Sequence, residues 1–266
     1  MSKVIIDAVT GVGVPDSLSD GKSAGPYIDV NECFCEAFQG EGAYSGVPAL
    51  FLRVAGCHVG CRWCDTKEAW GRGIRFSVSD LVSVFDSNGL VQLMERGHHL
   101  VVTGGSPLLQ QDSLVVFLRE LSSKCNVKPF IEIENECSMV VSRDCESLFG
   151  LIDCWNCSPK LSGSGVPEEK RYCPDAVRQV VSMAKESWFK FVVSPDHLSE
   201  DWYEIDRLFI RDGLVCKDRI ILMPEGSGPE ELCSDRRAAV AEFAVSHDVR
   251  YSERVHVNLY GRRRSV

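Results

Sequence analysis

The stretch Gly56-Cys-His-Val-Gly-Cys-Arg-Trp-Cys-Asp-Thr66 decides the fold, because it places three cysteines directly after a run of apolar residues. That run, Ala49-Leu-Phe-Leu-Arg-Val-Ala55, is typical of a buried strand that ends at Gly56. Cys57, Cys61 and Cys64 follow within eight residues. Ligands of parallel sheets bind beyond the C-terminal ends of the strands, so we expect this loop to lie at a site.

Strand-like and helix-like segments alternate on both sides of the loop, which predicts an α/β fold with a mostly parallel sheet. Residues 1–26 are rich in Gly, Ser and Pro and are expected to form a partly disordered N-terminal arm, with one catalytic domain over 27–266. A helix is expected to begin at Ser77 or Ser79, each a suitable N-cap. The other expected helices span 112–123, 175–184, 201–211 and 230–247, and the expected strands span 31–38, 49–55, 99–103, 129–134, 151–155, 188–193, 219–223 and 250–257.

The composition excludes several classes of protein. Lys and Arg number 29 against 38 Asp and Glu, a net charge of −9, which disfavours direct nucleic-acid binding. The one dense basic run, Arg262-Arg263-Arg264, is either a small-anion contact or a solubilising tail. No apolar stretch approaches the roughly 18 residues that span a membrane. The acidic Asp7 interrupts the N-terminus too early for the apolar region of a secretory signal. The chain also has an odd number of cysteines, thirteen, so we expect most thiols to be free in a reducing cytoplasm.

The cysteine loop alone leaves three interpretations open. A zinc site needs a fourth ligand, for which His58, Cys33, Cys35 or Asp65 is available. A [4Fe–4S] cluster held by three cysteines leaves one iron free to bind a substrate or cofactor. In the third interpretation, the three thiols bind no metal and are ordinary core or loop residues.

The surrounding motifs narrow the choice, because together they resemble the 7-carboxy-7-deazaguanine synthase family of the radical S-adenosylmethionine (SAM) superfamily. The resemblance covers about Val30 to Val266 and implies the partial, modified (β/α) barrel of that superfamily. The motifs that carry it are the cysteine loop, Phe38-Gln-Gly-Glu-Gly42, Phe51-Leu-Arg53, Thr103-Gly-Gly-Ser-Pro-Leu108, Ser158-Pro-Lys160, Phe189-Lys-Phe-Val-Val193, Met223-Pro-Glu-Gly226 and His256-Val-Asn-Leu-Tyr-Gly261.

The resemblance implies a role for each matching residue. Cys57, Cys61 and Cys64 hold a [4Fe–4S] cluster whose open iron binds SAM, and Thr66 lends its hydroxyl to a Mg²⁺ that bridges to the substrate. The substrate contacts are Gln39 and Glu41 at the ring edge, Arg53 at the carboxylate, and Thr103, His256 and the terminal carboxylate of Val266. The SAM contacts are Gly104, Gly105, Ser106, Glu134, Ser158 and Lys160. Taken singly, Thr66 suits a turn cap, Arg53 a structural ion pair, and Lys190 either a site or a surface role.

One motif departs from the family pattern. Ser106 stands where Gly-Gly-Glu-Pro has a glutamate that accepts a hydrogen bond from the SAM amino group. Glu132, Glu134 and Glu136 fall at alternate positions of the next strand, so one of them is expected to supply the missing charge.

The implied activity is that of a lyase that converts 6-carboxy-5,6,7,8-tetrahydropterin to 7-carboxy-7-deazaguanine by radical ring contraction with loss of ammonia, SAM being regenerated. The product feeds queuosine-type tRNA modification or modified DNA bases. The implied partners are an electron donor such as flavodoxin and a second copy of the chain. Two alternatives stand beside this prediction: a glycyl-radical-type activase, and a nonenzymatic iron–sulfur or zinc binding module.

Overall fold

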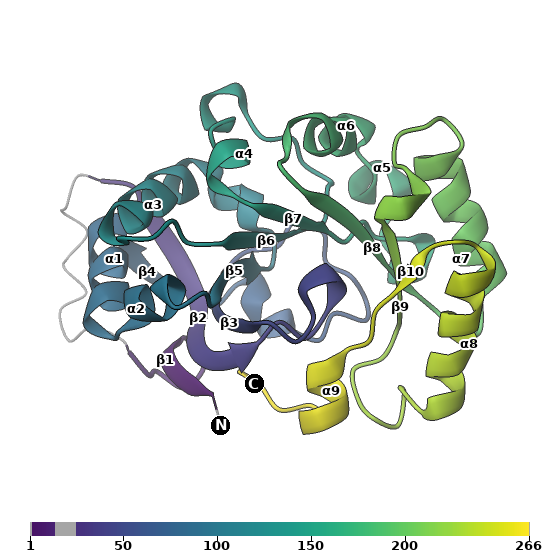
Figure 1. The fold of residues 1–266 in the computed structure, drawn as a ribbon, viewed down its shortest axis with the longest axis horizontal. Coiled ribbons are helices and arrows are strands. Elements are labelled where there is room, and N and C mark those ends of the chain that lie inside the picture. The colour runs from purple at the N-terminus through teal and green to yellow at the C-terminus, as the bar shows by residue number, and fades with distance from the viewer. Residues whose placement is uncertain (1, 14–24, 266) are drawn as a thin grey trace.

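A single ten-stranded sheet forms the centre of the protein in a computed structural model that describes residues 2–13 and 25–265 (Figure 1). Its order is β1-β2-β3-β5-β6-β7-β8-β9-β10, with β4 paired to β2. The strands from β3 to β10 along this path are parallel, whereas β2 is antiparallel to its neighbours. The strands are β1 Lys3–Asp7, β2 Tyr27–Phe38, β3 Pro48–Val54, β4 Ile74–Ser77, β5 His99–Gly104, β6 Ile131–Asn135, β7 Cys154–Cys157, β8 Ser187–Val193, β9 Ile220–Pro224 and β10 Arg250–Tyr251.

Helices up to α8 alternate with the parallel strands and lie outside the curved sheet, whereas α9 follows the last strand and contributes to a cavity wall (Figure 1). The helices are α1 Val78–Ser87, α2 Leu90–Glu95, α3 Gln111–Lys124, α4 Leu148–Leu151, α5 Glu168–Arg171, α6 Pro174–Met183, α7 Leu198–Ile205, α8 Ser234–Ser246 and α9 Val255–Tyr260. Since β1 and β10 lie at opposite ends of the strand order, the barrel is partial. The predicted α/β class with a mostly parallel sheet is confirmed.

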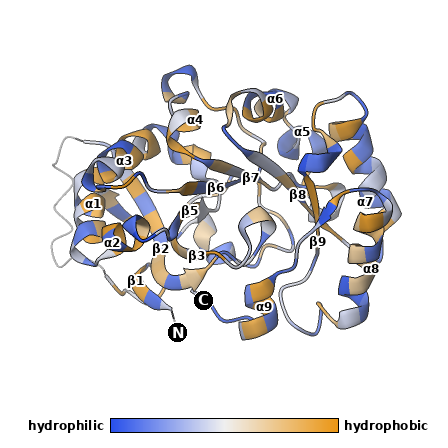
Figure 2. Ribbon diagram, in the orientation of Figure 1, coloured by the Kyte–Doolittle hydropathy of each residue, from blue (hydrophilic) through white to orange (hydrophobic). Residues whose placement is uncertain are grey.

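Apolar patterning explains why these segments pack as they do (Figure 2). In α3 the buried Leu114, Phe117, Leu118 and Leu121 recur at helical spacing and face the sheet. Almost all of β5 is buried, as expected for a strand covered on both faces. Ser77 caps α1 by accepting a hydrogen bond from the Asp80 backbone N–H at 3.1 Å, which confirms one of the two predicted caps.

The N-terminal arm is not free over its first residues. Lys3–Asp7 is a strand whose Ile5 and Ile6 are buried, and it pairs with β2. Residues 3–7 of the expected arm are therefore an ordered strand of the sheet, while 14–24 lies outside the described residues. The domain division at residue 26 stays a prediction.

Two expected strands are shorter than the sequence indicated. The strand predicted over 250–257 is limited to β10, because the chain turns after Tyr251 and continues as α9, with the Val255 N–H donating to the Gly40 carbonyl. The strand predicted over 151–155 is β7, which begins at Cys154 because Leu148–Leu151 forms a helical turn. Short apolar runs do not distinguish helix from strand. The sequence also missed β4 and α2.

No helix within 2–13 and 25–265 is both long and apolar enough to cross a membrane.

Candidate active site

A cavity of about 890 Å³ opens where the parallel strands end. Thr103, Glu134 and Ser158, from the ends of β5, β6 and β7, contribute to its wall. Every site residue predicted from the sequence lines it except Ser106 and Val266, and Val266 lies outside the described residues. The fold therefore brings residues from across the chain into one chamber.

The three loop cysteines lie on one side of this chamber. All three thiols are free, Cys61 is buried, and Cys57 and Cys64 are half-buried. They pack with a small apolar group that includes Val59 and Val166. Burial raises the pKa of the Cys61 thiol, and the nearby charge of Lys160 opposes that shift. Three free thiols from one loop around a cavity fit a [4Fe–4S] cluster with one open iron.

The double glycine after β5 lets the backbone approach this loop closely. A Cβ on Gly105 would lie 2.1 Å from the Gly56 carbonyl oxygen and 2.7 Å from the Cys57 Cβ. A Cβ on Gly104 would lie 2.4 Å from the Val54 carbonyl oxygen, and its φ of +159° also suits glycine. A side chain at Gly105 would therefore collide with the start of the cysteine loop, and one at Gly104 would collide with the end of β3.

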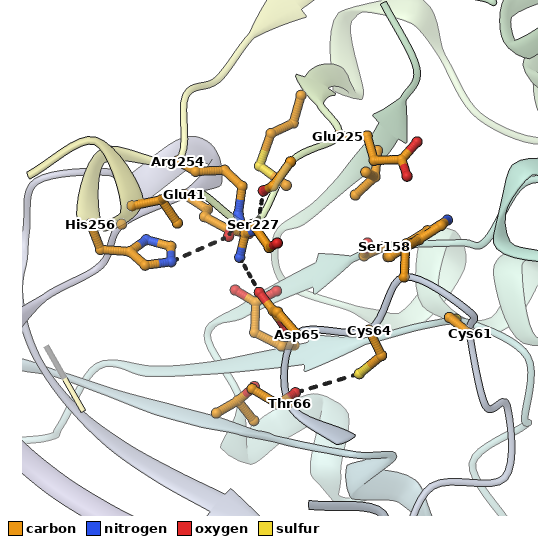
Figure 3. Close-up of a pocket in the computed structure, with 18 of the residues that line it drawn as sticks. Glu41, Cys61, Cys64, Asp65, Thr66, Ser158, Glu225, Ser227, Arg254 and His256 are labelled. Carbon is orange, nitrogen blue, oxygen red and sulfur yellow. Dashed lines mark hydrogen bonds and ion pairs between the residues drawn. The ribbon is translucent and has the colours of Figure 1, made fainter. Parts of the chain in front are cut away.

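A network of charges forms the other side of the chamber (Figure 3). Lys190 Nζ lies 2.5 Å from Glu41 Oε2 and 3.4 Å from Glu134 Oε2. Gln39 Nε2 donates to Glu134 Oε1 at 3.2 Å. Burial alone would raise the pKa of Glu41, but Lys190, Arg254 and His256 outweigh it and hold that pKa well below its usual value. Burial dominates at Glu134, so its pKa is raised.

Arg254 joins this network to the cysteine loop. Its Nε donates to Glu41 at 2.8 Å, one Nη to Asp65 at 2.5 Å, and the other Nη to the Gly226 carbonyl at 2.6 Å. Burial opposes ionisation of Asp65, yet Arg254 lowers its pKa below the usual value. The guanidinium thus connects the segment before α9 to two loops far apart in sequence (Figure 3).

His256 packs against the glycine between Gln39 and Glu41. A Cβ on Gly40 would lie 2.1 Å from His256 Nδ1, so only glycine leaves room for this imidazole. Burial lowers the pKa of His256, although the charge of Glu41 pulls it upward. The imidazole is therefore mainly neutral near pH 7.

Arg53 is held by a carboxylate on the neighbouring strand. Its Nε donates to Glu32 at 2.7 Å, and the two residues are opposite each other in the β2–β3 pairing. The Nη atoms of Arg53 make no hydrogen bond to the described residues. Glu32 also accepts from Ser265 at 2.8 Å and from Arg264 at 3.4 Å, which anchors the C-terminal segment at the chamber.

The remaining predicted residues have simpler surroundings. Thr66 Oγ1 lies 3.6 Å from Cys64 Sγ. Lys160 donates to Ser158 Oγ at 3.0 Å and lies over the Trp63 ring. Among the described residues, no three His, Cys, Asp or Glu side chains converge as a single metal ion would require.

Sequence reasoning missed Glu32 and Arg254, which bond to Arg53 and Glu41, and did not decide the role of Lys190. Lys190 had a signal, since a lysine within the apolar run 189–193 is expected to meet a carboxylate. In the structure Lys190 is only 3% exposed, as this argument requires. Glu32 and Arg254 had none, because their partners Arg53 and Glu41 are distant in the chain.

A partial (β/α) barrel with a three-cysteine loop at its C-terminal edge defines the class of radical SAM enzymes. Two solved structures share the fold: a crystal structure of QueE from Escherichia coli, with a TM-score of 0.61 and 24% identity over 86% of this chain and 95% of that chain, and histidine-tagged anSMEcpe with bound AdoMet, with a TM-score of 0.52 and 12% identity over 75% and 60%. The model of a 4Fe-4S single cluster domain matches residues 38–160.

Sequence comparison identifies the family within this class. The 7-carboxy-7-deazaguanine synthase of Pyrobaculum aerophilum is 32% identical over 91% of this chain and 99% of its own length. That of Halobacterium salinarum is 30% identical over 89% and 91%. The chain belongs to the 7-carboxy-7-deazaguanine synthase family, and neither the activase nor the nonenzymatic module is favoured.

Proposed function

We propose that this protein converts 6-carboxy-5,6,7,8-tetrahydropterin to 7-carboxy-7-deazaguanine by radical ring contraction with loss of ammonia. The observation that carries the proposal is that the cysteine loop and the charged network around Glu41 line one and the same cavity. When bound, a reduced [4Fe–4S] cluster and SAM supply the 5′-deoxyadenosyl radical that begins the reaction. The residues of the chain bind and orient the pterin and exclude water.

The ring edge of the pterin is assigned to Gln39, Glu41 and Glu134. Glu41 stays ionised because its pKa is lowered, so it accepts hydrogen bonds from N–H groups of the ring. Glu134, expected from the sequence to contact SAM, lies instead within reach of Gln39 and Lys190. This position supports a substrate role for Glu134, with Lys190 balancing both carboxylates.

The pterin carboxylate is assigned to Arg53, with Thr103, His256 and the Val266 terminus beside it. Because Glu32 accepts a hydrogen bond only from Nε of Arg53, the two Nη atoms are available to donate to both oxygens of the pterin carboxylate. Arg264 and Ser265 both bond to Glu32, the carboxylate that holds Arg53, whereas Val266 lies outside the described residues. A neutral His256 adds a hydrogen bond without adding charge.

SAM is assigned to the cysteine loop, Gly104, Gly105, Ser158 and Lys160. The closely packed glycines present backbone groups where side chains would obstruct the ligand. Lys160 is suited to the SAM carboxylate, since its ammonium lies at the cavity wall near Cys61.

A Mg²⁺ at Thr66 is part of the proposal. The hydroxyl lines the cavity next to the cysteine loop, and Mg²⁺ takes most of its remaining ligands from water and substrate oxygens. Thr66→Ala is expected to need more Mg²⁺ for product formation while SAM cleavage continues. Thr66→Ser, which keeps the hydroxyl, is the matched control, and an unchanged Mg²⁺ requirement in Thr66→Ala would contradict the assignment.

A flavodoxin-type electron donor, a homodimer and a cytoplasmic location complete the proposal. The exposed Arg62 in the cysteine loop is a local positive charge that supports an acidic reductant at that loop. All thirteen cysteines are free, which supports a reducing compartment. The product is a precursor of queuosine or of modified DNA bases.

Anaerobic reconstitution followed by turnover tests the function. The wild type is expected to bind about four irons and to release 7-carboxy-7-deazaguanine from the carboxytetrahydropterin. Cys61→Ala should lose the cluster, whereas Cys216→Ala, which removes an exposed thiol outside the cavity, should keep it. Cluster formation and SAM cleavage without pterin turnover would refute the proposed substrate.

A further inference from the structure

Glu136 is a buried carboxylate at the edge of the cavity, and the proposed function gives this residue no role. It follows β6 directly, is only 6% exposed and lines the cavity. Its Oε1 lies 3.6 Å from Nδ1 of His58 in the cysteine loop, and Gly105 lines the same cavity. Glu136 therefore lies at the cavity beside the cysteine loop.

The contacts of Glu136 do not balance its charge. Oε1 lies 3.4 Å from Ser138 Oγ and 3.6 Å from His58 Nδ1. Oε2 has no hydrogen-bond partner within the described part of the chain. His58 bonds to Ser138 through its other ring nitrogen, at 2.9 Å, and its buried Nδ1 is left without a hydrogen bond. A carboxylate this buried needs a close donor or cation, and none of these groups supplies a good one.

The other two carboxylates of this segment are already committed. Glu132 is fully buried and bonds to His99 at 2.6 Å and to Asn156 at 2.5 Å. Glu134 pairs with Lys190 and Gln39 on the pterin side. Of these three carboxylates, Glu136 is the one that lines the cavity beside the cysteine loop with an oxygen that accepts no hydrogen bond from the described residues.

Ser106 does not take the role of the glutamate it replaces. Its side chain is completely buried, and its hydroxyl points to Cys57 Sγ at 3.7 Å rather than into the cavity. Position 106 therefore lacks the expected carboxylate acceptor, whereas the carboxylate of Glu136, which follows the neighbouring strand β6, lies beside His58.

We propose that Glu136 accepts a hydrogen bond from the amino group of SAM, replacing the glutamate for which this chain has Ser106. The assignment rests on the proposed function, since it requires SAM in the cavity. It gives Glu136 Oε2 a hydrogen-bond donor, which no described residue provides, beside the long bond from Ser138 to Oε1. It also explains how the site tolerates serine in its Gly-Gly-Ser-Pro motif.

Binding of SAM to the reconstituted enzyme, measured by anaerobic equilibrium dialysis, tests the assignment. Glu136→Gln is expected to weaken SAM binding about tenfold, which corresponds to about 1.4 kcal/mol. The affinity for 5′-methylthioadenosine, which lacks the amino acid part of SAM, should change less than about twofold. Ser138→Ala, a neighbour that does not line the cavity, should change neither affinity by more than about twofold.

Unchanged SAM affinity in Glu136→Gln would overturn the assignment and leave Ser138 and His58 as the partners of Glu136. Equal losses for both ligands would overturn it too, because they would indicate general damage. If Glu136→Gln fails to hold the cluster, Glu136→Asp is used, with an expected SAM-specific loss of about threefold; no loss or a parallel loss would count against the assignment. A wild type that binds SAM but does not convert the pterin would refute the proposed substrate and leave Glu136 assigned.

Discussion

Replacing Arg254 by glutamine is expected to destabilise the protein strongly, because the guanidinium is the central partner of two acidic loops. Its side chain is 13% exposed and makes close hydrogen bonds to Glu41, Asp65 and the Gly226 carbonyl. Glutamine is close in size but cannot reach all three or carry the charge. Glu41 would keep Lys190 and His256, whereas Asp65 would lose its one hydrogen-bonding partner among the described residues.

The magnitude follows from the three contacts. The bonds to Glu41 and Gly226 contribute about 1.5 kcal/mol each, the lower end for hydrogen bonds to charged groups. The bond to Asp65 contributes less than about 1 kcal/mol, because that side chain is 38% exposed and regains water. The expected loss of about 3 kcal/mol lowers the Tm by about 6–12 °C.

The assay is thermal unfolding of the reconstituted enzyme without oxygen, compared with Arg207→Gln. Arg207 also makes two hydrogen bonds to a carboxylate, Glu168, but both side chains are about 40% exposed. Its replacement should lower the Tm by no more than about 2 °C. A decrease of less than about 2 °C for Arg254→Gln, or equal decreases in the two variants, would refute the reasoning.

Three further predictions test other parts of the site and fold. Gly105→Ala should reduce the iron content after reconstitution, because its Cβ would collide with the Gly56 carbonyl, whereas Gly150→Ala, with open space around it, should not; equal iron contents would contradict this. Ser106→Ala removes the hydroxyl that points to Cys57 Sγ, so an EPR-monitored redox titration should give a midpoint potential about 20–40 mV more negative, and an unchanged potential would exclude that bond. Burial raises the pKa of Asp201 from 3.8 to about 6, so the native state favours the protonated carboxyl and the wild type loses stability as the pH rises from 3.8 to about 6. The Tm advantage of Asp201→Asn over the wild type should therefore grow by about 2–4 °C, or about 1 kcal/mol, from pH 5 to pH 7.5; an advantage that shrinks over this range would reverse the sign.

Local sequence was sufficient for the elements whose pattern is reinforced by their own neighbours. Three features depend only on residues close together in the chain: the apolar run of β3, the helical spacing in α3 and the cap at Ser77. The sequence therefore predicted the bounds of β3 and α3 to within one residue, and the cap as one of two candidates. The region after Tyr251 was not, because the alternation of Val255-His-Val257 favours a strand locally, while α9 forms through contacts with Gly40 on a distant loop.

The sequence by itself determined the class of protein and the three cysteines, because their spacing and the motifs around them lie within short stretches of chain. Tertiary structure alone decided how charge is distributed in the cavity. Glu134 faces Lys190, Glu136 faces the cysteine loop, and Arg254 joins Glu41 to Asp65, although spacing along the chain treats the carboxylates of 132–136 as equivalent. The physical reason is that the Coulomb energy of a buried carboxylate depends on which cation the fold brings within a few ångströms, and those cations come from β8 and from the segment before α9.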